Sequence, residues 1–146
     1  MGVFDAKDMT VRTGILEETG HGQILEIEFN GIHTHHWPEG GSPGSFIDGE
    51  VNNSKPAAIL FNFAKYHYEW GDEIGGLILS ACIATRPDPV KHMAIIATGV
   101  TARSLRSLLS GMNLERVFKL GLFEDIESGR SFLRRALEDT ANTPEG

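Results

Sequence analysis

Two strand-like runs, each followed by a helical pattern, constrain the fold more than any other feature of the chain. The apolar run from Ala57 to Phe63 is typical of a strand that is buried on both faces. Apolar residues then recur at helical spacing, and the predicted buried face carries Ile74, Leu77, Ile78, Ala81 and Cys82. A second buried strand from His92 to Ala97 precedes a second helix, for which Thr101 is the expected N-cap. Successive strand–helix–strand units predict parallel strands with right-handed crossovers, and therefore an α/β fold.

The first thirty residues predict an antiparallel hairpin. Leu25, Ile27 and Phe29 alternate with glutamates, which is the pattern of a strand with one solvated face. A turn signal at residues 19–22 precedes this strand, and residues 11–17 supply its partner. We therefore expect a mixed sheet, with an N-terminal antiparallel hairpin followed by parallel strands, and with helices on its faces.

We expect a single domain over residues 1–139. Glycine, proline and asparagine interrupt every periodic pattern between residues 31 and 55, so this stretch is predicted to be a long loop. A short strand or turn near residues 117–120 leads to a last helix over about residues 128–138. Its basic residues, such as Arg130 and Arg134, are expected to form a solvated face or a patch for an acidic partner. Residues 140–146 are predicted to be a disordered tail.

The composition disfavours several classes of protein. Lys and Arg number 13 against 20 Asp and Glu, and the net charge of −7 argues against binding to nucleic-acid phosphates. No apolar run approaches the roughly 18 residues of a membrane span, and the N-terminus lacks the apolar core of a signal peptide. We therefore expect a cytoplasmic protein with no membrane partner. The single Cys82 cannot form an intrachain disulfide or a cysteine-based zinc site.

The turn after the first buried strand is the first candidate binding surface. It reads Trp70-Gly71-Asp72-Glu73-Ile74-Gly75, and open α/β sheets bind their ligands beyond the carboxyl ends of their strands. Asp72 and Glu73 place negative charge at the positive end of the helix dipole, where a carboxylate also caps backbone N–H groups. Asp72 is therefore a helix cap, part of a binding surface, or both. An exposed strand end that suits a protein interface is expected where the strand meets this turn, at Tyr66, His67, Tyr68 and Trp70.

A metal or catalytic site is the second candidate. His33 and His35 stand at i and i+2, which points both side chains to one face of a strand, and His36 follows them. A third ligand would come from Glu39, Asp48, His67 or His92. This cluster supports an alternative function as a metal-binding protein or metal-dependent enzyme, with Asp72 or Glu73 as the acid–base group. The chain contains no P-loop and no G-x-G-x-x-G motif, and we expect no catalysis and no cofactor.

Residues 57–77 resemble the STAS domain, which is named for sulphate transporters and anti-sigma factor antagonists. In that family a buried strand ends in an acidic residue, and a D-S-S-G-L-G-like turn then opens a helix. Here Asn62 stands at the usual acidic position, and the turn is matched by Trp70-Gly71-Asp72-Glu73-Ile74-Gly75. The strand and glycine turn at residues 92–100, with the segments that follow, extend the resemblance over about residues 10–138.

The resemblance implies a non-catalytic regulatory module of bacterial partner-switching signalling. Its implied partner is an anti-sigma factor, a serine kinase-like protein or further copies of the same chain, and docking is implied at Trp70, Gly71, Asp72, Glu73, Ile74 and Gly75. The family's turn carries a phosphorylated Ser or Thr, whereas Asp72 stands at that position here, or Glu73 if the alignment slips by one residue. Because a carboxylate partly imitates phosphate, we expect a permanently charged turn that phosphorylation cannot switch. A small-ligand sensor, with residues 31–55 as a lid, is a further alternative.

Overall fold

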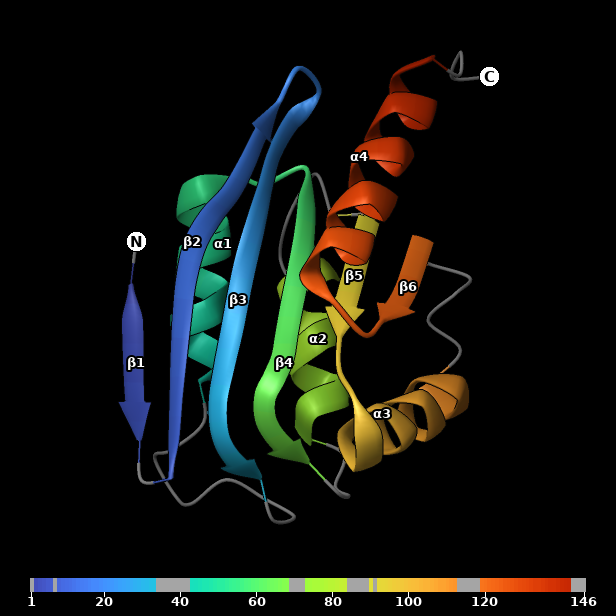
Figure 1. The fold of residues 1–146 in the computed structure, drawn as a ribbon. Helices are drawn as coiled ribbons and strands as arrows, with labels where there is room; N and C mark the ends of the chain where they lie inside the picture. The colour runs from blue at the N-terminus through green and yellow to red at the C-terminus, as the bar shows by residue number, and fades with distance from the viewer. Residues whose placement is uncertain are drawn as a thin grey trace.

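The computed structural model describes residues 2–6, 8–33, 43–68, 73–83, 90, 92–112 and 119–142 of the chain. Its elements are, in order, β1 (Val3–Ala6), β2 (Met9–Thr19), β3 (Gly22–His33), α1 (Gly44–Ser54), β4 (Ala58–Tyr68), α2 (Glu73–Ile83), β5 (His92–Ile96), α3 (Gly99–Met112), β6 (Lys119–Phe123) and α4 (Ile126–Asn142). The described strands form a six-stranded sheet in the order β1-β2-β3-β4-β5-β6 (Figure 1).

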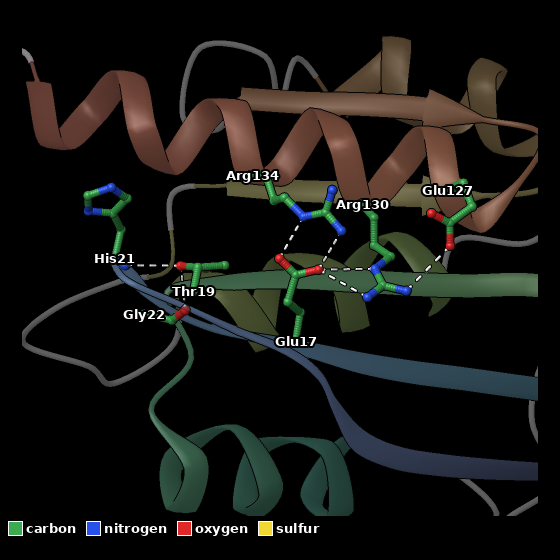
Figure 2. Close-up of polar contacts among 7 residues, drawn as sticks. All are labelled: Glu17, Thr19, His21, Gly22, Glu127, Arg130 and Arg134. Carbon is green, nitrogen blue, oxygen red and sulfur yellow. Dashed lines mark hydrogen bonds and ion pairs between the residues drawn. The ribbon is translucent and has the colours of Figure 1, made fainter.

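The sheet is mixed, as the sequence predicted. β1, β2 and β3 pair antiparallel, whereas β3, β4, β5 and β6 pair parallel. The predicted hairpin is confirmed as β2 and β3, and the turn between them is closed by Thr19. The Thr19 hydroxyl accepts a hydrogen bond from the His21 N–H at 3.0 Å and donates one to the Gly22 carbonyl at 2.8 Å (Figure 2).

Helices cover both faces of the sheet, but unequally. α1, α2 and α3 pack on one face, where Ile47, Ile78 and Leu105 join apolar side chains of β3 and β4. α4 lies on the opposite face, where Leu133 and Leu137 join a smaller cluster from β3, β4 and β5. Figure 1 shows α4 in front of the sheet and α1 and α2 behind it. Burial on both faces explains why β4 and β5 are continuous apolar runs in the sequence.

Several boundaries differ from the sequence prediction. Residues 31–55 are not one long loop, because β3 continues to His33 and α1 occupies Gly44–Ser54. α4 extends to Asn142, so residues 140–142 are helical and not part of a disordered tail. β1 is an additional strand whose four residues are too few for a periodic signal. None of the described helices has both the length and the apolar character needed to span a bilayer.

Candidate functional site

The carboxyl ends of the parallel strands meet the starts of α2 and α3 at one end of the sheet. β4 ends at Tyr68 before α2 begins at Glu73, and β5 ends at Ile96 before α3 begins at Gly99. β3 ends beside β4, because His33 is in register with Tyr68. Figure 1 shows the arrowheads of β3 and β4 and the helix α3 at this end of the molecule. Strand ends of this kind are where open α/β sheets bind their ligands.

Thr101 ties the start of α3 to the end of β4. Its side chain is buried, and its hydroxyl accepts a hydrogen bond from the Tyr68 N–H at 3.1 Å and donates one to the Tyr66 carbonyl at 3.0 Å. The expected N-cap role of Thr101 is wrong, because α3 already begins at Gly99, whose φ of 58° is left-handed. The hydroxyl bonds to β4 instead, which fixes the position of α3 relative to the sheet.

The end of β4 is not the exposed aromatic surface that the sequence suggested. Tyr66 and Tyr68 are only 3% and 1% exposed. A bulge in β4 after Asn62 explains the difference, because β4 has one extra residue there opposite β3. The bulge changes which side chains face the core, so the two tyrosines point inward while Lys65 and His67 are exposed.

A shallow groove of about 360 Å³ lies between this strand end and the start of α3. The exposed part of its lining includes the Lys65 ammonium, the His67 imidazole and the Val100 side chain, which is 38% exposed. An open surface that mixes charged, hydrogen-bonding and apolar groups is typical of contact with another protein, whereas small-ligand sites enclose most of the ligand.

The first turn of α2 is the described part of the predicted docking turn. Glu73 is half-buried at the start of the helix and places its carboxylate near the positive end of the helix dipole. Ile74 and Gly75 are buried, so they pack α2 onto the sheet. Gly76 is the exposed position of this turn. The remaining predicted contact residues lie outside the described part of the chain: Trp70, Gly71 and Asp72.

Asn62, which the sequence resemblance puts at a usually acidic position, is a buried hydrogen-bonding group within β4. Its side chain is 3% exposed, donates to Glu26 Oε2 at 3.0 Å and accepts from the Ala64 N–H at 3.0 Å. An amide can donate and accept at once, whereas an ionised carboxylate at this position would lack the donor that Glu26 requires. Asn62 therefore joins β4 to β3 and shapes the bulge, and the strand end lies beyond it.

The histidine cluster falls largely outside the described residues. His33 ends β3, but its side chain, like His35 and His36, is not among them. His67 is in register with Ile32, the residue before His33, so it lies near the end of β3. His92 cannot join a metal site there, because it is in register with the first residue of β4, whereas His67 lies near the last. About nine residues of strand separate these positions, which corresponds to roughly 30 Å. Within the described residues, no group of three or more His, Cys, Asp or Glu side chains could hold a metal ion.

A charged cluster joins β2 to α4 at the other end of the sheet (Figure 2). Glu17 accepts hydrogen bonds from Arg134 Nε at 2.6 Å and Nη2 at 2.7 Å, and from Arg130 Nε at 3.2 Å and Nη2 at 3.0 Å. These bonds, above all those from Arg134, lower the pKa of Glu17 from 4.5 to about 2. Arg130 also pairs with Glu127 at 3.3 Å. The two arginines therefore remain partly exposed but are bound to a carboxylate of the sheet, so they do not form the acidic-partner patch that was one of the two expectations.

Comparison with known proteins identifies a fold for this chain. No family model and no curated protein matches it in sequence. Among solved structures, the chain is similar to an anti-sigma factor antagonist from Mycobacterium paratuberculosis, with 10% sequence identity and a TM-score of 0.61. The match covers 89% of this chain and 97% of that one. The mixed sheet with its flanking helices is therefore the fold of an anti-sigma factor antagonist.

Proposed function

We propose that this protein is a regulatory module that acts by binding other proteins and catalyses no reaction. The observation that carries the proposal is the match in fold to an anti-sigma factor antagonist over 89% of the chain. Since the match also covers 97% of that structure, the two chains share a whole architecture and not a common fragment. One fold hosts many functions, so the proposal also requires a surface that can dock a partner.

The docking surface in this proposal is the turn from Trp70 to Gly75 together with the exposed groups around it. Glu73 and Gly76 supply its accessible part on α2, while the buried Ile74 supports the helix from below. The groove beside the end of β4 extends this surface toward α3. Several exposed groups of different chemistry therefore surround one turn, which is what a protein partner can recognise.

Asp72 gives the proposed surface a permanent negative charge. Residues 70–75 contain no Ser or Thr, so a kinase cannot phosphorylate this turn. A carboxylate at the start of a helix partly imitates the charge of a phosphate group there. The proposed partner is an anti-sigma factor or a serine kinase-like protein of a bacterial cytoplasm, and its binding would not depend on phosphorylation of the turn.

Affinity capture followed by calorimetry tests this function. The full chain is used as bait in three forms: wild type, Asp72→Ser and Asp5→Asn. Serine is a good N-cap, so Asp72→Ser removes the charge while keeping the capping group. Asp5 is exposed on β1, at the far edge of the sheet, and serves as the control. We expect wild type and Asp5→Asn to retain an anti-sigma factor or serine kinase-like protein.

The captured partner is then purified and titrated against each form. We expect Asp72→Ser to weaken its affinity by about tenfold, as loss of one interfacial charge contact commonly does. A partner with kinase activity should also phosphorylate the new serine, which would place the turn in its binding site. Equal affinities for all three forms would put the docking surface elsewhere. Failure to capture such a partner, with a metal or small molecule in the purified chain, would instead support the alternative functions.

A further inference from the structure

β6 forms one edge of the sheet within the described part of the chain (Figure 1). The Phe123 carbonyl accepts a hydrogen bond from the Ala97 N–H at 3.0 Å, so the backbone groups of Phe123 point toward β5. Because consecutive residues of a strand direct these groups to opposite sides, the N–H and C=O groups of Leu120 and Leu122 point to the outer edge. An edge of this kind is a template for pairing with another strand.

α4 forms the wall of a groove of about 780 Å³ beside this edge. Phe123 and Phe132 line it, with ring centroids 5.2 Å apart. Both rings lie over Gly121, which has no Cβ atom. A Cβ added at this position would overlap the Phe123 ring and would lie 3.3 Å from Phe132 Cε2. Phe132 therefore marks the point of α4 nearest the middle of β6, with Glu127 before it on the helix and Arg135 after it.

We propose that β6 pairs antiparallel with β6 of a second copy of this chain, about a two-fold axis at Gly121. Leu120 would then lie opposite Leu122 of the partner subunit, and each such pair would exchange two N–H···O=C hydrogen bonds. Gly121 would lie opposite Gly121 of the partner subunit in a non-hydrogen-bonded pair, where the two backbones approach to about 4.5 Å. A residue without Cβ at this position leaves room for the Phe123 rings of both copies.

Two of the charged groups that line the groove, Glu127 and Arg135, become neighbours of opposite charge under this symmetry. The axis runs perpendicular to the sheet, so both α4 helices lie on the same face and run in opposite directions. Arg135 of one copy therefore faces the end of the partner helix that carries Glu127. Arg135 is exposed, and it has no ion pair with any described residue of its own chain. Two equivalent pairs of opposite charge would form, one on each side of the axis.

The spacing of the helices also fits this arrangement. α4 packs mainly on β5, so three strand spacings, or roughly 14 Å, would separate the two helices. Directly packed helices lie about 8–10 Å apart, so a gap remains between them. The groove of each copy faces this gap, and large side chains from both copies are available to fill it: Phe123, Phe132 and Arg135.

Hydrogen exchange of the full chain, measured by NMR at low and high concentration, tests the pairing directly. The amides of Leu120 and Leu122 should exchange more slowly as the concentration rises, because they become bonded between copies. The amides of Gly121 and Phe123, which face β5 in the single chain, are the internal control and should not change. Sedimentation equilibrium over the same range should show a mass of twice 16.0 kDa.

Charge reversal shows whether α4 lies in the interface. We expect Arg135→Glu to weaken self-association by about tenfold, because both symmetric pairs become repulsive. The double variant Glu127→Arg/Arg135→Glu should restore it, while Arg103→Glu, at an exposed position of α3, should leave it unchanged. A chain that stays monomeric, or a dimer in which the Leu120 and Leu122 amides still exchange rapidly, would overturn the proposal. Neither result bears on docking at the α2 turn, which involves other residues.

Discussion

Replacing Glu17 by Gln tests the charged cluster that fastens α4 to the sheet, because this change removes the charge and keeps the shape of the side chain. Glu17 is 18% exposed, and its pKa is lowered from 4.5 to about 2 chiefly by the hydrogen bonds from Arg134. At about 1.4 kcal/mol per pKa unit, this shift sets an upper limit of roughly 3 kcal/mol on the contribution of the charge. Arg134 is 41% exposed, so solvent screening reduces that limit. We expect Glu17→Gln to lower the free energy of unfolding at pH 7 by about 1–2 kcal/mol.

The contribution of Glu17 depends on pH in a defined direction. Its pKa in the folded state lies below the ordinary value of 4.5, so the contribution is complete above that value and is lost as the pH falls toward about 2. Urea unfolding of the wild type and Glu17→Gln, followed by circular dichroism at pH 7, 5 and 3, measures this dependence. The difference between the two proteins should be nearly constant from pH 7 to 5 and should shrink at pH 3.

Glu18→Gln is the matched control for this experiment. Glu18 is the exposed neighbour of Glu17 and accepts a hydrogen bond from Gln23 Nε2 at 2.8 Å. We expect this variant to lower the free energy of unfolding by less than about 0.5 kcal/mol, as is usual for loss of an exposed polar contact. Equal losses for the two variants at pH 7 would refute the reasoning. So would a Glu17→Gln difference that persists undiminished at pH 3.

Three further substitutions test contacts that position the candidate site, each by chemical denaturation. Asn62→Asp should lower the free energy of unfolding by about 1–3 kcal/mol at pH 7, because it removes a buried donor and places a carboxylate beside Glu26, the present acceptor. This loss of stability should diminish below pH 5. Thr101→Val should lower the free energy of unfolding by about 1–3 kcal/mol, because it leaves backbone groups of β4 unpaired. Its control is Thr98→Val at an exposed position, which should lower that free energy by less than about 0.5 kcal/mol. Gly31→Ala should lower the free energy of unfolding by at least about 1 kcal/mol, because the φ of Gly31 is 122° and a Cβ there would overlap the backbone carbonyl of Asp8. Gly14→Ala, with no atom within 4 Å of a Cβ, is its control and should be tolerated.

Elements with a strong local pattern could be predicted from the sequence, and those without one could not. The alternation at Leu25 and Ile27 identified β3, because one face of that strand is buried and the other is not. α1 was missed because its buried side chains are Ile47 and Val51. Two apolar residues one turn apart do not distinguish a helix from a loop, and the glycines and asparagines around them favour a loop.

The sequence predicts a docking turn after the first buried strand, but the details of the strand end beside that turn depend on contacts between distant segments. The bulge after Asn62 arises from the parallel pairing of β4 with β3, so no local pattern predicts that Tyr66 and Tyr68 turn inward. No local pattern predicts the charged cluster around Glu17 either, since 117 positions of the sequence separate Glu17 from Arg134. The i, i+4 spacing of Arg130 and Arg134 is common on solvated helices, and this spacing alone does not indicate a carboxylate on another strand.

The order of the strands keeps the two proposed surfaces apart. The docking turn follows β4, whereas the edge of β6 lies beyond β5, so pairing through β6 leaves the turn accessible. Antiparallel pairing also points the strands of the two copies in opposite directions, which puts their carboxyl ends at opposite ends of the dimer. A single compact partner therefore cannot bridge both docking turns, and the dimer would bind one partner molecule per chain. At a concentration where it is monomeric, the Arg135→Glu variant should then bind its partner as tightly as the dimer does, because neither turn borrows a residue from the other copy.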